Sequence, residues 1–259
     1  MTQDPTAAPV CPRHPDRVSY VRCQRCGRPA CPECQRPAAV GIQCVDCVRE
    51  AKANARPMRN RLGFTSALGT PYVTYGLIIA NVAAFVYGYL VLGKNRWWLE
   101  WALIPGAGEA TGGIGDEWYR WITSGFIHFS LWHIGMNMFV LWQFGTQLEP
   151  ILGRVRFSLL YAASMIGGSA AVVLLGQGGI HGGASGAIFG VIAAYAVVLF
   201  KLRLDYRSLV TTAGLWLVLG FVIPGISWQG HLGGAVAGAA TMLAMLHWVD
   251  RQPAARRPS

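Results

Sequence analysis

Hydrophobic and polar residues follow two different patterns along the chain, and the change falls near position 70. The first 69 residues are polar, rich in Arg, Cys and Pro, and contain no apolar run that resembles a signal peptide. Six apolar stretches follow, at 72–92, 126–144, 157–175, 185–200, 209–223 and 231–248. Since a helix needs about 20 apolar residues to cross a bilayer, the pattern predicts an all-α polytopic membrane protein with six spans.

Domain limits follow from the same pattern. We expect a cysteine-rich module at 1–50, a basic juxtamembrane linker at 51–70, a six-span domain at 71–250 and a basic tail at 251–259. The fourth and fifth stretches are shorter than a full crossing requires. A short helix among longer neighbours begins below the membrane surface, so its end can hold a buried site.

Composition supports a membrane protein and argues against a soluble enzyme or a disordered chain. Hydrophobic residues make up 53% of the chain and charged residues 13%, about half the share of charge usual in soluble proteins, and the mean hydropathy is +0.35. The net charge is +10. Half of the Lys and Arg residues lie in the first 61 positions, so the positive charge is no sign of a nucleic-acid-binding domain, and nucleic acid is an unlikely partner.

Basic residues also predict the orientation in the membrane, because Lys and Arg accumulate on the cytoplasmic side. The N-terminal segment, the second-to-third and fourth-to-fifth connections and the tail hold all of these residues except Lys94, Arg96 and Arg120. We therefore expect a multi-pass protein of the cell membrane, the inner membrane in bacteria, with both termini in the cytoplasm.

The seven cysteines all lie in the segment assigned to the reducing cytoplasm, where disulfides are rare. With one histidine they form four C-x2-C or C-x2-H pairs: Cys11/His14, Cys23/Cys26, Cys31/Cys34 and Cys44/Cys47. Eight ligands match two tetrahedral zinc sites, and we expect two Zn²⁺ ions here. The alternative is a set of reduced thiols without a role.

The spacing of these pairs resembles the cross-braced B-box type of zinc finger. The resemblance implies that the first and third pairs hold one zinc and the second and fourth pairs the other. The first candidate function of the module is to lie on an anionic lipid surface and so orient the first span. The second candidate is binding of a protein partner.

Polar residues inside a bilayer are costly and call for an explanation. His128, His133 and Asn137 lie in the second stretch, and the latter two share one helix face because they are four residues apart. Ser185 begins the fourth stretch and His231 the sixth. In the predicted topology these three stretches run in the same direction, so all five side chains lie at the outer ends of their helices.

A serine beside a histidine is an activated nucleophile, and helix N-terminal N–H groups with further donors can bind an oxyanion. Gly186-x3-Gly190 and Gly234-x3-Gly238 let the fourth and sixth helices approach closely. Each feature alone has a simpler explanation, since Ser185 can be an N-cap and His231 a packed core residue. Their common depth favours a catalytic site. His181 and His247 are assigned no chemical role.

At these residues the chain resembles the rhomboid intramembrane serine proteases over about residues 72–250. The matching motifs are Tyr119-Arg120, Phe126-Ile127-His128, His133-x3-Asn137, Gly145-x3-Glu149-x3-Gly153, Gly183-Ala184-Ser185-Gly186 and Gly230-His231-Leu232-Gly233-Gly234. The resemblance implies a six-helix rhomboid-like bundle and an endopeptidase that cleaves transmembrane segments of membrane proteins near their extracytoplasmic ends. It also implies that catalysis needs no cofactor.

The resemblance also implies residue roles. Ser185 is then the nucleophile and His231 the base of a dyad without an acid. His133, Asn137 and the Ser185 amide form the oxyanion hole, with Gly183 and His128 beside the substrate. For His128 the alternatives are retention of water and anchoring of a loop. Two further residues, Arg120 and Glu149, become structural.

Phe189 departs from the family pattern, in which many members have Tyr, but its ring can still stack on His231.

Besides the protease, two other function classes remain open. One is a rhomboid-like pseudoprotease that binds membrane clients without cleavage, and the other is an unrelated small transporter or channel.

Overall fold

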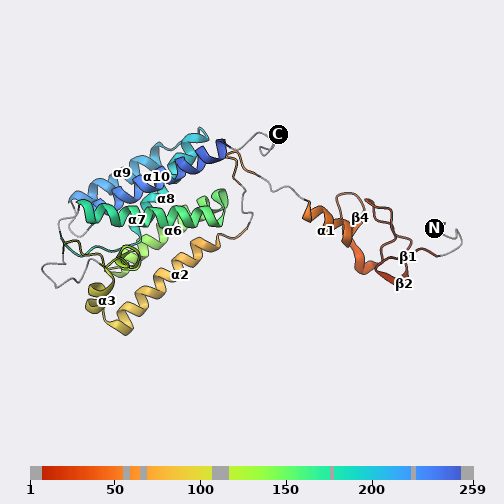
Figure 1. The fold of residues 1–259 in the computed structure, drawn as a ribbon, viewed down its shortest axis with the longest axis horizontal. Helices are drawn as coiled ribbons and strands as arrows, with labels where there is room; N and C mark the ends of the chain where they lie inside the picture. The colour runs from red at the N-terminus through yellow and green to blue at the C-terminus, as the bar shows by residue number, and fades with distance from the viewer. Residues whose placement is uncertain are drawn as a thin grey trace. The chain divides into compact units, whose positions relative to one another are not determined.

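The protein, described by a computed structural model, divides into two compact units, Met1–Pro57 and Met58–Ser259. The structure describes residues 8–54, 59–64, 69–106, 117–175, 178–222 and 226–251. Each unit is considered by itself, and Figure 1 gives the course of the chain through both.

The N-terminal unit consists of two small antiparallel hairpins and one helix. Strand β1 (Val10–Cys11) pairs with β2 (His14–Val18), and β3 (Gln35–Pro37) pairs with β4 (Ile42–Cys44). A 3-10 turn, η1 (Pro32–Cys34), precedes β3, and helix α1 (Val45–Ala53) follows β4. The buried cluster of this unit contains six cysteines and Ala30. A centre made of thiols rather than aliphatic side chains points to metal as the source of stability.

The second unit is a helix bundle. Its longer helices are α2 (Tyr72–Tyr87), α3 (Lys94–Trp101), α6 (Leu131–Leu152), α7 (Arg154–Leu175), α8 (Ser185–Lys201), α9 (Arg207–Val222) and α10 (Trp228–Asp250). Three short elements complete it: a π-helical turn η2 (Gly88–Leu92) after α2, helix α5 (Arg120–Thr123) and the 3-10 turn η3 (Ser124–Phe126). The mainly helical architecture predicted from the apolar pattern is confirmed.

Three helical segments of the described part of the chain are long and apolar enough to cross a membrane: Tyr72–Leu92, Arg154–Leu175 and Trp228–Asp250. Helix α8 is apolar but shorter, with 17 residues. Helix α6 has 22 residues and carries several polar side chains, and α9 has 16. Each predicted stretch therefore corresponds to a helix, although Ile223, the last residue predicted for the fifth, lies outside the described residues.

Four of the predicted helix starts need correction. Helices α7 and α9 begin at Arg154 and Arg207, three and two residues earlier than predicted. The second stretch was expected to begin at Phe126, but α6 begins at Leu131, because the Ser130 hydroxyl accepts a hydrogen bond from the His133 N–H at 3.1 Å and caps the helix there. The sixth was expected to begin at His231, but α10 begins at Trp228. His231 therefore lies in the first turn of its helix rather than at its first residue.

Glycines bring α7, α8 and α10 into close contact, and these helices lie together in Figure 1. A Cβ atom on Gly186 would lie 3.1 Å from the Gly230 carbonyl oxygen, and one on Gly190 would lie 2.7 Å from that of Gly234. A Cβ on Gly238 would overlap the backbone of Gly190. The predicted contact between the two small-x3-small faces is confirmed, and it joins the helix of Ser185 to the helix of His231.

Gly234→Ala is expected to destabilise the bundle, because the new methyl group would overlap the backbone carbonyl of Gly186. Overpacking of this kind typically costs about 1–3 kcal/mol, so the midpoint of thermal unfolding in detergent should fall by several degrees. The matched control is Gly76→Ala on α2, where a Cβ meets no atom within 4 Å. An equal midpoint in both variants would contradict the close packing of α8 and α10.

Two buried charged side chains, both predicted to be structural, hold backbone groups at helix ends. The carboxylate of Glu149 accepts hydrogen bonds from the N–H groups of Val73 and Thr74, at 3.0 and 2.8 Å, and so caps the start of α2. The guanidinium of Arg120 donates to the carbonyl oxygens of Leu99 and Ala102, at 2.6 and 2.8 Å.

Part of the stretch assigned to a linker packs on the bundle. Helix α1 ends at Ala53, whereas Phe64 is fully buried within the second unit. The Asn60 side chain donates to the carbonyl oxygen of Ile151 at 2.8 Å, and the Arg156 guanidinium lies over the Phe64 ring. Residues 59–64 therefore belong to the folded bundle.

Candidate active site and metal-binding clusters

A serine and a histidine meet where α8 and α10 begin. The Ser185 Oγ and the Nε2 of His231 lie 2.8 Å apart. Ser185 is the first residue of α8, and His231 is fixed by the first-turn hydrogen bond from its N–H to the Ser227 carbonyl at 3.2 Å. The distance is within the range of a nucleophile bound to its general base.

The ring of His231 is held by stacking. The Phe189 ring lies one turn after Ser185, with its centroid 4.3 Å from that of His231 and the planes inclined by 13°. This confirms the contact expected at Phe189. In the described residues nothing pairs with Nδ1 of His231, which is buried. In a Ser-His-Asp triad a carboxylate orients the base. No carboxylate in the described part of the chain does so for His231.

His133 faces Ser185 across Gly183. A Cβ placed on Gly183 would lie 3.0 Å from the Nε2 of His133 and 3.5 Å from the Ser185 Oγ. Gly183 has a φ of +137°, where an L side chain is strained, so glycine is required on both grounds. The Phe129 N–H donates to Nδ1 of His133 at 3.4 Å. In the neutral ring the proton therefore lies on Nε2, the nitrogen that faces the serine.

Asn137 lies one turn further along α6 and is buried. Its side-chain amide donates to the carbonyl oxygen of His133 at 2.8 Å. An amide has two N–H donors, so the second is available to a substrate oxygen.

His128 packs behind His133. The two ring centroids lie 5.0 Å apart, and His128 is fully buried. Its Nδ1 is 3.3 Å from the carbonyl oxygen of Phe126, and its Nε2 has no partner within the residues that the structure describes. The described contacts of His128 are thus with the His133 ring and the Phe126 carbonyl oxygen.

A cavity opens beside the Ser-His pair, and most of its lining residues are small. It is lined by Leu103, Ser124, Gly125, Met165, Gly168, Ser169, Val172, His181, Gly182, Gly183, Ser185, Gly186, Ala187, Ser227, Gly230 and His231. Of the predicted site residues, Ser185, His231 and Gly183 are therefore in its wall, whereas His133, Asn137 and His128 are not. Four polar residues of the wall are not among the predicted site residues: Ser124, Ser169, His181 and Ser227.

Two groups of thiol and imidazole side chains form the candidate metal sites of the N-terminal unit. Their members are Cys11, His14, Cys31 and Cys34 in one group, and Cys23, Cys26, Cys44 and Cys47 in the other. Within each group the ligand atoms all lie within 4.8 Å of one another. The cross-braced grouping predicted from the B-box resemblance is confirmed, and either group can hold a metal ion.

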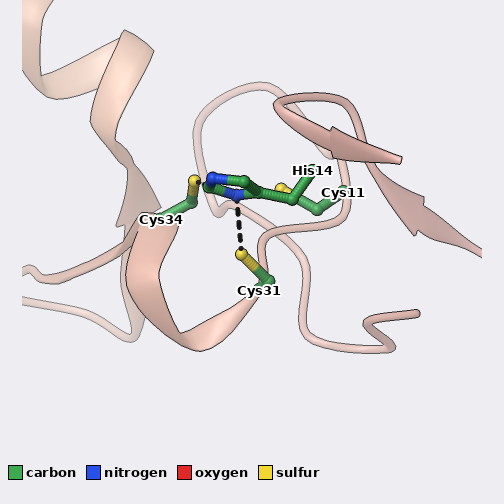
Figure 2. A group of neighbouring side chains, drawn as sticks. All are labelled: Cys11, His14, Cys31 and Cys34. Carbon is green, nitrogen blue, oxygen red and sulfur yellow. Dashed lines mark hydrogen bonds between the residues drawn. The ribbon is translucent and has the colours of Figure 1, made fainter. Parts of the chain in front are cut away.

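The geometry within the groups fits tetrahedral zinc. Zn–S and Zn–N bonds of about 2.3 and 2.0 Å place two sulfurs about 3.8 Å apart, and a nitrogen and a sulfur about 3.5 Å apart. The sulfurs of Cys26 and Cys44 are 3.8 Å apart. In Figure 2 the Nδ1 of His14 points at the sulfurs of Cys31 and Cys34, at 3.2 and 3.4 Å. Its other nitrogen lies 3.8 Å from the Glu33 carboxylate, a common outer partner of a metal-bound histidine.

The surroundings of the thiols act in both directions on the thiolate form that a metal requires. Burial raises the pKa of the Cys34 thiol to about 11 and that of the Cys47 thiol to about 12, whereas hydrogen bonds lower the pKa of other cysteines. A backbone hydrogen bond from Cys31 is the main cause that lowers the pKa of the Cys11 thiol to about 6. The Arg28 guanidinium donates to the Cys26 sulfur at 3.3 Å and lowers the pKa of that thiol. Cys26 is the exposed member of its group.

Comparison with known proteins identifies the helical unit. The family model described as the Rhomboid domain matches residues 115–248. Rhomboid protease GluP of Bacillus subtilis (strain 168) is 30% identical over 175 residues, which are 66% of this chain and 34% of GluP. Rhomboid-type serine protease 2 of Emericella nidulans is 32% identical over 143 residues, 51% of this chain and 27% of that protein.

A third relative is Rhomboid protein 1, mitochondrial, of Saccharomyces cerevisiae, which is 32% identical over 174 residues, 65% of this chain and 45% of that protein. The aligned part thus spans less than half of each of these three relatives. The family match covers more than half of the present chain and includes the Ser-His pair and the surrounding glycines. The chain belongs to the rhomboid family.

Proposed function

We propose that this chain is an intramembrane serine endopeptidase that cleaves transmembrane segments of membrane proteins near their extracytoplasmic ends. The observation that carries the proposal is the 2.8 Å contact between Ser185 Oγ and His231 Nε2 in the wall of a cavity. The contact pairs a nucleophile with a base between the starts of two helices. The rhomboid family match supports the same reaction class.

In the first half of the reaction the Ser185 oxygen attacks the scissile carbonyl carbon and its proton moves to His231 Nε2. The carbonyl π electrons move to its oxygen, which becomes an oxyanion. When the intermediate collapses, the carbon–nitrogen bond breaks and the His231 proton goes to the leaving amine. In the second half water attacks the carbonyl carbon of the acyl-enzyme and gives a proton to His231. The bond between that carbon and Ser185 Oγ then breaks, and His231 returns the proton to Oγ.

The oxyanion would be bound by groups on α6 and α8. The Ser185 N–H belongs to the first turn of α8, whose first N–H groups have no partner within the helix. The Nε2–H of His133 and the second amide proton of Asn137 can donate beside it. These donors come from rigid helices, which preorganises them for the developing charge.

Asn137→Ala and His133→Ala are expected to slow cleavage of a transmembrane model substrate. Loss of one oxyanion donor typically costs about 10²–10³ in rate, and the remaining donors keep the variants above background. The rate constant of labelling by a fluorophosphonate should fall in parallel.

The matched control for these variants is Gln143→Ala, since Gln143 is an exposed residue of the same helix. It should cleave at the wild-type rate. Full rates in both Asn137→Ala and His133→Ala would remove α6 from the proposed site.

Charge supports the proposed orientation, with both termini in the cytoplasm and the dyad towards the extracytoplasmic side of the cell membrane. The substrates in this proposal are membrane proteins that reach the cavity through the bilayer.

We further propose that the N-terminal unit binds two Zn²⁺ ions through the eight residues of its two clusters. The ions stabilise that unit and take no part in cleavage. The unit would contact anionic lipid or a protein partner near the first span. Its exposed arginines support the lipid surface as the first candidate. Arg22 and Arg36 are exposed and donate to backbone carbonyl oxygens, whereas other arginines of the unit lie beside its own carboxylates.

Covalent labelling tests the reaction class against the pseudoprotease. In detergent, a fluorophosphonate should label the wild-type chain at Ser185, and Ser185→Ala should remove the label. A wild-type chain that neither labels nor cleaves would favour a client-binding pseudoprotease.

A further inference from the structure

A second serine and histidine lie hydrogen-bonded in the wall of the same cavity. The Nδ1 of His181 is 3.0 Å from the Ser227 Oγ. His181 stands four residues before Ser185, and Ser227 four residues before His231, so both pairs are separated by 46 positions. In the first pair the serine comes first in sequence and the histidine second, whereas in the second pair the histidine comes first and the serine second.

The surroundings of His181 settle the direction of its hydrogen bonds. Its Nε2 lies 2.9 Å from the Gly178 carbonyl oxygen, which can only accept. In the neutral ring the proton is therefore on Nε2, and the Ser227 hydroxyl donates to Nδ1. The backbone of His181 is also held, because it exchanges two hydrogen bonds with Leu103, at 2.9 and 2.8 Å.

Ser227 in turn is tied to the start of α10. It is the residue before the helix, and its carbonyl accepts the His231 N–H at 3.2 Å. The His181–Ser227 bond thus joins the segment that leads into α8 to the segment that leads into α10. These are the segments whose relative position sets the distance between Ser185 and His231.

We propose that His181 and Ser227 are a positioning pair for the catalytic dyad. This inference rests on the proposed protease function. His231 has no carboxylate partner among the described residues, so its position depends on the Phe189 ring and on how α10 begins. The positioning pair holds the start of α10 to the segment before α8. Both of its residues lie in the cavity wall.

Loss of the His181–Ser227 hydrogen bond should lower the rate of the reaction step and leave the amount of folded protein unchanged. A hydrogen bond contributes about 0.5–1.5 kcal/mol, which corresponds to a change of about two- to thirteenfold. We therefore expect kcat per active site to fall by roughly that factor in Ser227→Ala and in His181→Ala, with KM changed less than twofold. Ser227→Thr keeps the hydroxyl and should restore most of kcat.

The experiment measures kcat and KM on a transmembrane model substrate, with active sites counted by fluorophosphonate labelling. The variants are Ser227→Ala, Ser227→Thr, His181→Ala and the double variant His181→Ala/Ser227→Ala. Ser158→Ala, at an exposed position of α7, is the control. The double variant should be no slower than the slower single variant, because one bond is lost in all three.

Wild-type kcat per site in both single alanine variants would overturn the positioning role, and so would additive losses in the double variant. If one variant folds poorly, the other still reports on the same bond from the opposite segment. Labelling that persists in Ser185→Ala and disappears in Ser185→Ala/Ser227→Ala would also overturn it, since Ser227 would then be a nucleophile. The proposed function fails separately, by absence of labelling and cleavage in the wild-type chain.

Discussion

Ser185→Ala and His231→Ala are each expected to abolish cleavage of a transmembrane model substrate while the protein remains folded. The serine oxygen forms the covalent bond, and the histidine lies 2.8 Å away to accept its proton. In a serine protease such a loss amounts to about 10⁶ in kcat, which brings cleavage below detection in detergent or in proteoliposomes. Gel analysis of the substrate fragments measures it.

The two losses should not add, because nucleophile and base act as one unit. The double variant should therefore be as inactive as either single variant. Ser158→Ala on the exposed side of α7 should cleave like the wild-type chain. Substantial cleavage by Ser185→Ala would exclude the serine mechanism.

Removal of metal is expected to unfold the N-terminal unit and to leave cleavage unchanged. Structural zinc typically contributes about 10–16 kcal/mol to such modules, and the centre of this unit consists largely of thiols. Metal analysis of the full chain should find two zinc ions, since two groups of four ligand atoms are present. A chelator should then make residues 8–54 sensitive to limited proteolysis.

Cys31→Ser should lower the zinc content to one ion and expose the same segment, whereas Arg36→Ala, an exposed position in β3, should keep both ions. Deletion of residues 1–57 should leave an active bundle. The deletion must stop there, because Asn60 and Phe64 pack on the helices. Rapid loss of turnover on chelation of that shortened chain would mean that the reaction is metal-dependent.

Local residue patterns predict the presence of the helices better than they predict where the helices begin. The apolar stretches predicted the helices because burial in lipid or protein selects long apolar runs. The start of α6 was missed by five residues, since the helix begins where the Ser130 hydroxyl caps it. The start of α10 was missed because glycine and polar residues before His231 interrupt the apolar pattern without interrupting the helix.

Sequence by itself determined the membrane class, the cysteine pairs and the candidate dyad. Each depends on residue type and short spacing: apolar runs, C-x2-C pairs, and a serine and a histidine within glycine-rich motifs. The contact of the glycine faces was also predictable, because it requires only that side chains are absent at positions four apart.

Tertiary structure alone decided which atoms meet. The proton on His133 Nε2 follows from the Phe129 N–H that occupies Nδ1. The bond between His181 and Ser227 joins residues 46 positions apart. The sequence pattern assigns His181 no role, because a histidine in a glycine-rich loop has no local signal of its partner. The partner is set by how α8 and α10 pack, and that packing carries Ser227 to His181 and His231 to Ser185.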